Sequence, residues 1–389
     1  MLDIDLFAGA GGLAVGLRAA SFAPTDLYEV DPVACETLRH NNSSADATIE
    51  GRVFQEDVTK INWRRVTEPV RLLAAGTPCQ PFSLGGKHLA DRDGRNLFPE
   101  VLRAVRTLKP QAVLLENVRG LLRRAFQPYF EYVLRQLECP SVRPRPHELW
   151  QHHDERIRSY LCSPAYEPQY RVAWRLRDAA DYGVPQTRQR VFIIVTRSDL
   201  PPFEFPKPTH SRAALLKSLS TGQYWERHDI PRRDVRINGN GTLSLPLEPE
   251  DGRQPWRTVR DALAGLPRAS AREEGSEMNH WVIPGARRYA GHAGSILDWP
   301  SKTIKAGVHG VPGGENTLVE DSGKIRYYTL REIARLQTFP DSHFFRGARM
   351  HVTRQIGNAV PCELAAAVAR PLCDLLMGTQ PTKVGETWR

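Results

Sequence analysis

Leu2-Asp3-Ile4-Asp5-Leu6-Phe7, followed at once by Ala8-Gly9-Ala10-Gly11-Gly12, is the stretch that decides the fold of this chain. Its first half alternates enough to predict a β-strand, and a helical pattern runs from Leu13 to Ala20. Glycines at a strand-to-helix turn let a ligand approach the backbone closely and leave helix N–H groups free to bind it. On its own this turn is a weak signal of nucleotide binding.

Acidic residues at the expected spacing strengthen that signal. Glu29 and Asp31 follow the apolar pair Leu27-Tyr28, about 20 residues after the turn, where a ribose-binding carboxylate belongs. Asp57 follows residues 53–56 and could serve the end of a third strand in the same way. The turn and the acids together predict a nucleotide-like ligand at the carboxyl ends of the strands.

Two further apolar runs end in residues that can do chemistry. Leu72-Leu73-Ala74-Ala75-Gly76 precedes Thr77-Pro78-Cys79-Gln80-Pro81-Phe82-Ser83, which places a thiol at the carboxyl end of a strand. Taken alone, Cys79 could also be a buried cysteine, which is the commoner fate of this residue type. Glu116 ends the run 112–115 and could instead cap a helix or pair with an arginine.

The segment Gln186-Thr187-Arg188-Gln189-Arg190 leads into a predicted strand over residues 191–195. Alternate residues of an extended segment share a face, so Gln186, Arg188 and Arg190 should point the same way. Seen alone, the two arginines could equally lie on a solvated edge.

Composition agrees with a nucleic-acid partner without proving one. The 389 residues carry 53 Lys+Arg against 44 Asp+Glu, a net charge of +9 with a pI near 9.4, and such a surplus suits a polyanion. No apolar run approaches the length of a membrane span, and no signal peptide precedes the first strand. The cysteines form no C-x-x-C pair, which favours the reducing interior of a cell as the location. A zinc site is disfavoured because the spacings of its candidates fit no standard site: Cys139, His147, His152, His153 and Cys162.

The pattern along the chain predicts a catalytic and cofactor-binding domain over residues 1–205, a target-recognition domain over 206–325, and a return to the first domain over 326–389. In the middle part periodicity weakens, Asn238-Gly239-Asn240-Gly241 predicts a hairpin turn, and arginines interleave with tryptophans. The alternative is that these tryptophans form a small core and the arginines its wet surface. Thr329 and Glu332 then form a capping box that starts a helix of the returning segment.

At this point the chain resembles the DNA cytosine-C5 methyltransferases, in particular the bacterial enzymes of restriction-modification systems. The matching motifs follow the family's order and span nearly the whole chain: Phe7 to Gly12, Pro78-Cys79-Gln80, Glu116-Asn117-Val118, Gln186 to Arg190, Thr329 to Pro340, and Gln355 to Pro361. The resemblance implies an α/β fold of the S-adenosylmethionine-dependent methyltransferase type. That fold is a Rossmann-like mixed sheet with helices on both faces, plus a smaller, irregular β-rich recognition domain.

The resemblance also implies the reaction and the residues that carry it. The Cys79 thiolate would add to carbon 6 of a flipped-out cytosine and form a covalent adduct, so that carbon 5 can take a methyl group from S-adenosylmethionine. Glu116 would act on ring nitrogen 3, and Arg190, with Arg188 behind it, on the cytosine carbonyl. The implied cofactor-binding residues are Phe7, Gly9, Gly11, Gly12, Glu29, Asp57, Val58, Pro78, Leu97, Asn358 and Val360, with no metal.

The same resemblance sets expectations about partners and location. We expect double-stranded DNA as substrate, recognised at specific sequences, and a monomer on the DNA. We also expect no membrane association and a cytoplasmic, nucleoid-associated location. A cognate restriction endonuclease would act separately. A tRNA-methylating relative is disfavoured because the cysteine-phenylalanine-threonine tripeptide of that branch is missing. A catalytically silent DNA-binding relative would not need Cys79, Glu116 and Arg190 together, and a small-molecule methyltransferase would not need a long basic insertion.

Overall fold

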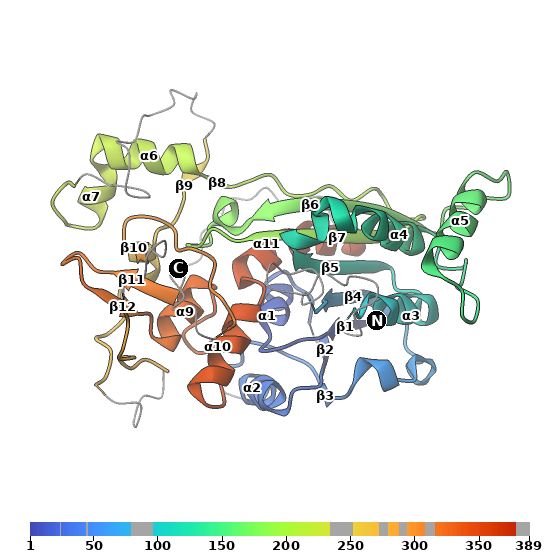
Figure 1. Ribbon diagram of the computed structural model, residues 1–389, viewed down its shortest axis with the longest axis horizontal. Coiled ribbons are helices and arrows are strands. Elements are labelled where there is room, and N and C mark those ends of the chain that lie inside the picture. Colours follow the sequence, from blue (N-terminus) through green and yellow to red (C-terminus); the bar gives the residue numbers. More distant parts are fainter. Residues whose placement is uncertain are drawn as a thin grey trace.

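The computed structural model describes residues 1–23, 25–43, 46–78, 96–233, 252–271, 279–287, 294–307 and 316–378. A seven-stranded sheet in the order β3-β2-β1-β4-β5-β7-β6 forms the centre of the molecule (Figure 1). Its strands are β1 Leu2–Leu6, β2 Thr25–Glu29, β3 Val53–Gln55, β4 Val70–Gly76, β5 Ala112–Val118, β6 Tyr170–Asp178 and β7 Gln189–Arg197.

The sheet is parallel except where β7 lies between β5 and β6. β7 runs antiparallel to both of these neighbours, with Val118 opposite Arg190, whereas β1 is parallel to β2 and to β4. The chain moves outward from β1 to β3 and then returns to place β4 on the other side of β1. Ligands of open α/β sheets bind outside the carboxyl ends of the strands at such a reversal. The predicted mixed α/β sheet is confirmed, and its reversal lies beside the glycine-rich turn.

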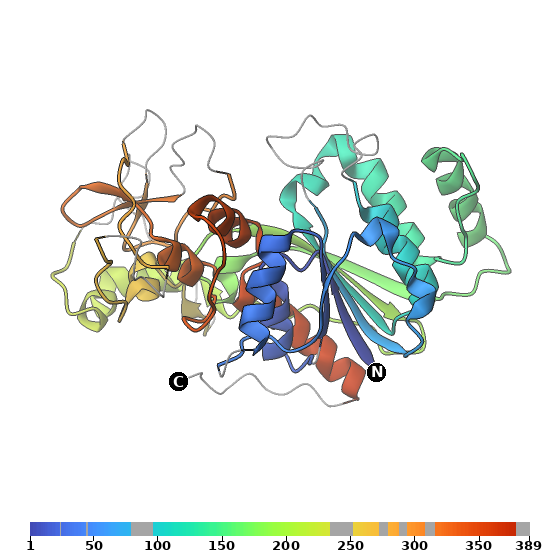
Figure 2. The same cartoon turned by 90° about the horizontal axis from the view of Figure 1, so that it is seen from below.

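Helices cover both faces of the sheet, as Figures 1 and 2 show. Alternate strand residues face opposite sides, so Leu73 and Leu115 join the core under α3 and α4, while Leu72 and Leu114 join the core under α1 and α11. The helices are α1 Gly12–Ala19, α2 Pro32–Ser43, α3 Phe98–Leu108, α4 Gln127–Glu138 and α11 Cys362–Met377. Short 3-10 helices connect them: η1 Val58–Lys60, η2 Trp63–Arg65, η5 Arg119–Leu122, η6 Arg124–Phe126 and η7 Ala179–Tyr182.

Helix α5, Trp150–Leu161, lies at the end of the molecule opposite α6 in both views (Figures 1 and 2). It packs against α4, and His153 forms hydrogen bonds through both ring nitrogens, to the Tyr132 hydroxyl at 2.8 Å and the Val142 carbonyl at 2.9 Å. Both ring nitrogens of His153 therefore help to hold α5 against α4 and against the segment that contains Val142. Among the described residues, no three His, Cys, Asp or Glu side chains gather as a metal site would require.

The 206–325 region contains short strands and short helices (Figure 1). Its elements are β8 His210–Ser211, α6 Arg212–Thr221, α7 Gln223–Arg227, β9 Gln254–Pro255, α8 Val259–Leu263, β10 Ser295–Ile296 and β11 Thr317–Val319, with β12 Ile325–Tyr327 at its end. Tyr224 and Trp225 form a small core of their own with Leu215 and Leu219. The predicted hairpin turn at 238–241 lies outside the described residues.

The returning segment packs against the amino-terminal part of the chain. It contains α9 Leu330–Leu336, α10 Arg349–Asn358 and α11, and the capping box of Thr329 and Glu332 is formed in both directions. Helix α11 lies so close to α1 that a Cβ at Gly16 would approach the Ala365 Cβ to 2.4 Å. Both ends of the chain thus build one sheet-and-helix unit. No described helix has the length and apolar character that crossing a membrane requires.

Candidate active site

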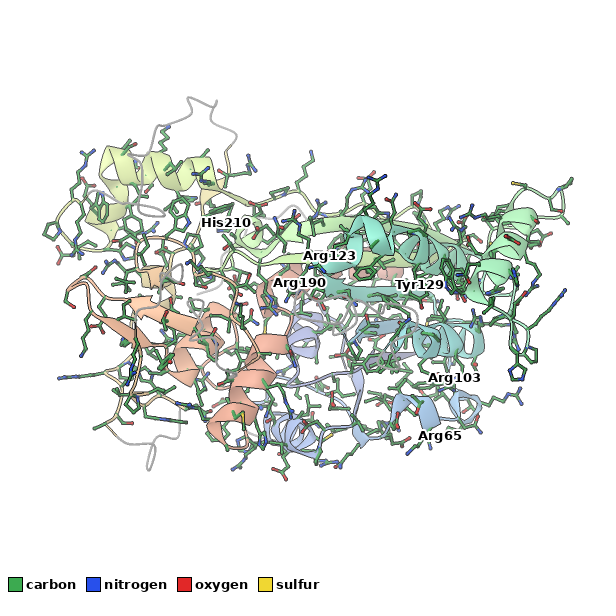
Figure 3. The ribbon with its side chains drawn as sticks, viewed as in Figure 1. Arg65, Arg103, Arg123, Tyr129, Arg190 and His210 are labelled. Carbon is green, nitrogen blue, oxygen red and sulfur yellow. The ribbon has the colours of Figure 1, made fainter. Side chains whose placement is uncertain are left out.

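The centre of the candidate site is an ion pair between strands β5 and β7. Glu116, near the end of β5, accepts from Arg190 of β7 at 2.8 Å between Oε1 and Nε, and both side chains are buried. The antiparallel register sets Val118 opposite Arg190, which brings the arginine within reach of a carboxylate two residues earlier. Figure 3 shows Arg190 near the junction of the sheet with the 206–325 region. The sequence predicted both residues for the site, and the structure brings them together.

Burial is the largest influence on the pKa of Glu116. Desolvation raises the pKa of the carboxyl, while the positive charges of Arg190 and Arg188 oppose it. A carboxyl with a raised pKa can hold a proton closer to neutral pH and donate it to a bound base. Among the described residues, Arg190 donates to Glu116 and to the Gln189 carbonyl, which uses two of the five N–H groups of a guanidinium and leaves the others for a substrate.

Cys79 lies in the segment 79–95, outside the described residues, and this segment follows β4, whose end is linked to β5 beside Glu116. Thr77 is buried, and its hydroxyl accepts from Asn117 Nδ2 at 2.8 Å, which links the first end to β5. At the other end, Asn96 donates to the Tyr129 hydroxyl at 2.6 Å. Thr77, two positions before Cys79, is therefore fixed at the carboxyl end of β4, beside the strand that carries Glu116.

The glycine-rich turn has an unusual backbone. Phe7, Gly9 and Gly11 all have positive φ, at 59°, 55° and 88°. This conformation is cheap for glycine but strained for phenylalanine, and such strain tends to persist where a binding turn needs it. Among the described residues, a Cβ at Gly9 would meet only the Phe7 carbonyl oxygen, at 4.0 Å, which leaves room for a ligand beside this backbone. Gly12 instead allows contact with the returning segment, since its Cβ would lie 2.6 Å from the Val360 carbonyl oxygen.

The two predicted acids are positioned by backbone hydrogen bonds. Glu29 Oε2 accepts from Gly9 N at 2.8 Å, and Oε1 accepts from Val30 N and Asp31 N, each at 2.8 Å. Glu29 therefore holds the turn in place and keeps one of its roughly four lone-pair positions for a ribose hydroxyl. Asp57 caps η1, and its Oδ1 accepts from the Thr59 hydroxyl at 2.8 Å and from Thr59 N at 3.0 Å; these two bonds lower the pKa of its carboxyl.

The remaining predicted cofactor residues come from four parts of the chain. Val58 and Val360 are buried, Asn358 is the exposed last residue of α10, and Leu97 precedes α3 as its N-cap. Pro78, the last described residue before the segment 79–95, is partly buried. Of these, Val360 is brought directly against the glycine-rich turn, through Gly12.

Asp5 is a residue of this site that the sequence did not single out. It lies on β1, two residues before Phe7, is 0% exposed, and neither carboxyl oxygen has a hydrogen-bond partner in the described part of the chain. Burial, helped by the charge of Glu29, raises the pKa of Asp5 to about 8. A buried acceptor without a partner is costly, so an orphaned carboxyl under an open turn suits a ligand that carries positive charge. S-adenosylmethionine, with its ammonium and sulfonium groups, fits that description.

Arg188, which the sequence resemblance placed behind Arg190, is buried and binds backbone carbonyls. It is 1% exposed and donates from Nη1 to the Ile304 carbonyl at 2.9 Å, and from Nη2 to the carbonyls of Gly357 at 2.6 Å and Ala359 at 3.1 Å. These contacts connect β7 with two segments that lie far along the chain. They support a positioning role for Arg188 behind Arg190.

Two buried glutamines complete this junction and were not predicted as site residues. Gln186 donates to the Leu336 carbonyl at 3.0 Å and to Gln337 Oε1 at 2.9 Å, and accepts from Ile304 N at 2.9 Å. Gln337 in turn donates to the Ile356 carbonyl at 2.6 Å. The alternation of Gln186 with Arg188 and Arg190 was the signal that could have marked the first of them.

Comparison with known proteins agrees with this geometry. The family described as C-5 cytosine-specific DNA methylase matches residues 1–139 and 147–373. The chain is 31% identical over 379 residues to the Type II methyltransferase M.PspPI of Psychrobacter sp. (strain TA137), covering 96% of this chain and 79% of that protein. It is 30% identical over 381 residues to the Type II methyltransferase M.NgoMIV of Neisseria gonorrhoeae, covering 96% and 97% respectively.

Solved structures support the fold. The Dnmt2 methyltransferase of S. pombe superposes with a TM-score of 0.57 at 17% identity, covering 97% of this chain and 98% of that one. The methyltransferase EhMeth of Entamoeba histolytica superposes with a TM-score of 0.55 at 15% identity, covering the same shares. At these identities the likeness concerns architecture only. The family match over most of the chain decides identity: this protein belongs to the C-5 cytosine-specific DNA methylase family and is a DNA cytosine-5 methyltransferase that uses S-adenosylmethionine.

Proposed function

We propose that this methyltransferase modifies cytosines at specific duplex sites through a covalent adduct of Cys79, as the modification enzyme of a restriction-modification system. The observation that carries the proposal is the buried Glu116–Arg190 pair, 2.8 Å between Nε and Oε1, beside the stem of the segment that holds Cys79. Similarity to Type II methyltransferases supports the biological role. A cognate endonuclease would act separately, and the methyltransferase would act as a monomer in the bacterial cytoplasm, on the nucleoid.

In the proposed reaction the target base leaves the helix, because its reacting carbons are hidden within the duplex. The Cys79 sulfur adds to carbon 6, and Glu116 protonates or hydrogen-bonds ring nitrogen 3 to take up the electron density that this addition releases. Arg190 donates to the cytosine carbonyl and keeps Glu116 oriented. Bound S-adenosylmethionine supplies the methyl group to carbon 5. Loss of the carbon 5 proton and of the Cys79 sulfur then restores the ring.

We propose that the cofactor lies at the reversal of the sheet, between the glycine-rich turn and the returning segment. Glu29 would accept from a ribose hydroxyl with its remaining lone-pair position, since its position is already fixed by three backbone N–H groups. Asp57 and Val58 would address the adenine. The main chain around Phe7, Gly9 and Gly11 would bind the methionine end of the cofactor. The rest of the cofactor site would be lined by Gly12, Pro78, Leu97, Asn358 and Val360.

We also propose that residues 206–325 choose the target sequence, with catalytic residues supplied by 1–205 and 326–389. Replacing residues 209–325 with the corresponding module of a relative should change which sites are methylated. Unchanged site choice in that chimera would place sequence reading elsewhere in the chain.

Bisulfite sequencing of DNA from cells that express the protein tests the proposal as a whole. We expect protected cytosines within one short sequence context, and none in cells that express the Cys79→Ala variant. Binding of duplex DNA by that variant should stay measurable, because the thiol acts in the chemistry. Normal methylation by Cys79→Ala would refute the nucleophile assignment, and methylation without sequence context would refute the specific-site proposal.

A further inference from the structure

An arginine-rich run follows directly after the Glu116-Asn117-Val118 strand end. Residues 119–126 form two successive 3-10 turns, η5 and η6, and the buried side chains of Leu121 and Phe126 anchor them in the core under α3 and α4. Arg119 and Arg124 are exposed on these turns. The apolar anchors thus fix the backbone, while the guanidinium groups face solvent.

The run lies beside the candidate active site. η5 contacts both β7 and α4, and Arg119 Nη1 donates at 2.8 Å to Oε1 of Gln189, the residue next to Arg190. Tyr129, near the start of α4, accepts from Asn96, the first described residue after the segment that contains Cys79. Figure 3 labels Arg123 of this run together with Arg190 and Tyr129. The arginines therefore border the edge of the sheet where a base must enter.

The exposed arginines of this run differ from the described arginines that form ion pairs with carboxylates. Arginines elsewhere are commonly matched by carboxylates, as in Arg135 with Asp154 at 2.7 Å and Arg326 with Glu332 at 2.6 Å. In the described part of the chain, Arg119 donates to the neutral amide of Gln189, and Arg124 forms no ion pair with a carboxylate. Exposed guanidinium groups without carboxylates are suited to phosphate, which they can bind through two parallel hydrogen bonds.

We propose that Arg119 and Arg124 bind backbone phosphates of the DNA strand that carries the target cytosine, next to the everted nucleotide. This inference rests on the proposed function, because it takes the duplex to be the substrate and the Glu116–Arg190 pair to receive the base. Phosphate contacts on both sides of an everted nucleotide hold its backbone in register while the base leaves the stack. They carry no sequence information, so they act on affinity and leave site choice to other residues.

Salt dependence of DNA binding tests the proposal directly. Each phosphate that an arginine neutralises releases counterions and adds about 0.9 to the slope of log affinity against log salt. We expect the double variant Arg119→Gln/Arg124→Gln to bind a methylatable duplex more weakly and to show a slope smaller by about 2. Its affinity for S-adenosylmethionine and its set of methylated sites should match the wild type. Fluorescence anisotropy over a series of KCl concentrations gives the slope.

The matched control is Arg171→Gln. Arg171 is also exposed and donates to the Leu200 carbonyl. It lies at the beginning of β6, at the end of the β6–β7 pair that is away from Arg190. We expect this control to keep the wild-type slope, and Arg119→Lys/Arg124→Lys to restore most of it through the retained charge. An unchanged slope in the glutamine double variant, or an equal change in the control, would overturn the inference. If the wild-type protein failed to methylate duplex DNA at all, the proposed function itself would fall.

Discussion

Replacing Asp5 by asparagine should stabilise the cofactor-free protein, and the gain should depend on pH. The carboxyl of Asp5 is 0% exposed, has no hydrogen-bond partner among the described residues, and has its pKa raised from 3.8 to about 8. The unfolded chain therefore ionises this group far below the pH at which the native protein does. Stability that is present at low pH is lost as the pH rises from about 4 to about 8.

The size of the effect follows from the width of that window. Each pKa unit corresponds to about 1.4 kcal/mol, so the loss at neutral pH reaches up to about 4 kcal/mol, and the part between about pH 5 and about pH 7 is about 3 kcal/mol. Asparagine fills a similar volume and cannot ionise. The Asp5→Asn variant should thus gain stability over the wild type, and the difference should widen with rising pH.

Urea unfolding of the cofactor-free protein at several pH values measures this difference. The matched control is Asp3→Asn on the same strand, where Asp3 accepts from Arg71 Nε at 2.9 Å and the removal of its charge leaves Arg71 without its acid partner. That control should lose stability, by about 3 kcal/mol, at every pH at which the pair is formed. A stability difference for Asp5→Asn that is independent of pH, or a loss of stability at about pH 8, would refute the reasoning.

The other predictions concern the catalytic role of Glu116, the buried contacts of Arg188 and the glycine-rich turn. Glu116→Gln should lower kcat by about 10²- to 10⁴-fold with little change in cofactor affinity. The kcat of the wild type should fall as the pH rises through the raised pKa of Glu116, because the protonated carboxyl is the active form. Profiles of kcat against pH for both proteins measure these two effects. Arg188→Met should lower the free energy of unfolding by about 3 kcal/mol or more, because it leaves buried carbonyls unsatisfied; stability equal to the wild type would contradict the positioning role. Gly12→Ala should cost about 1 to 3 kcal/mol and weaken S-adenosylmethionine binding in calorimetry, since its Cβ would lie 2.6 Å from the Val360 carbonyl oxygen.

The parts of the site that could be predicted from the sequence are those with a local signal. The glycine-rich turn and the strand ends at Glu116 and Thr77 each combine an apolar run with a residue type that closes it, whereas the alternation that ends at Arg190 precedes its apolar run. Carboxyl ends of parallel strands meet at one edge, so these signals predict that the turn, Thr77 and Glu116 gather. Arg190 joins them because β7 runs antiparallel to β5, which the sequence did not indicate. The Glu116–Arg190 contact shows that it does.

Contacts between distant segments could not be predicted in this way. The acceptors of Arg188 lie at Ile304, Gly357 and Ala359, more than a hundred residues along the chain, and no local pattern points to them. Asp5 looks like an ordinary polar position of an alternating strand until the structure shows it fully buried.

Helices α6 to α8 were also missed, because they are short and their stability depends on tertiary packing. A local signal did exist for α8, whose capping box of Thr258 and Asp261 stands in the sequence.

The central claim is that the sulfur of Cys79 bonds to a cytosine held by Glu116 and Arg190. The most direct measurement is mass spectrometry of the protein after reaction with S-adenosylmethionine and a duplex that carries 5-fluorocytosine at the target position. Fluorine cannot leave as the carbon 5 proton does, so the adduct should persist, and peptide mapping should place it on Cys79. An adduct on another residue, or turnover of the normal duplex without any trapped adduct on the fluorinated one, would contradict the account.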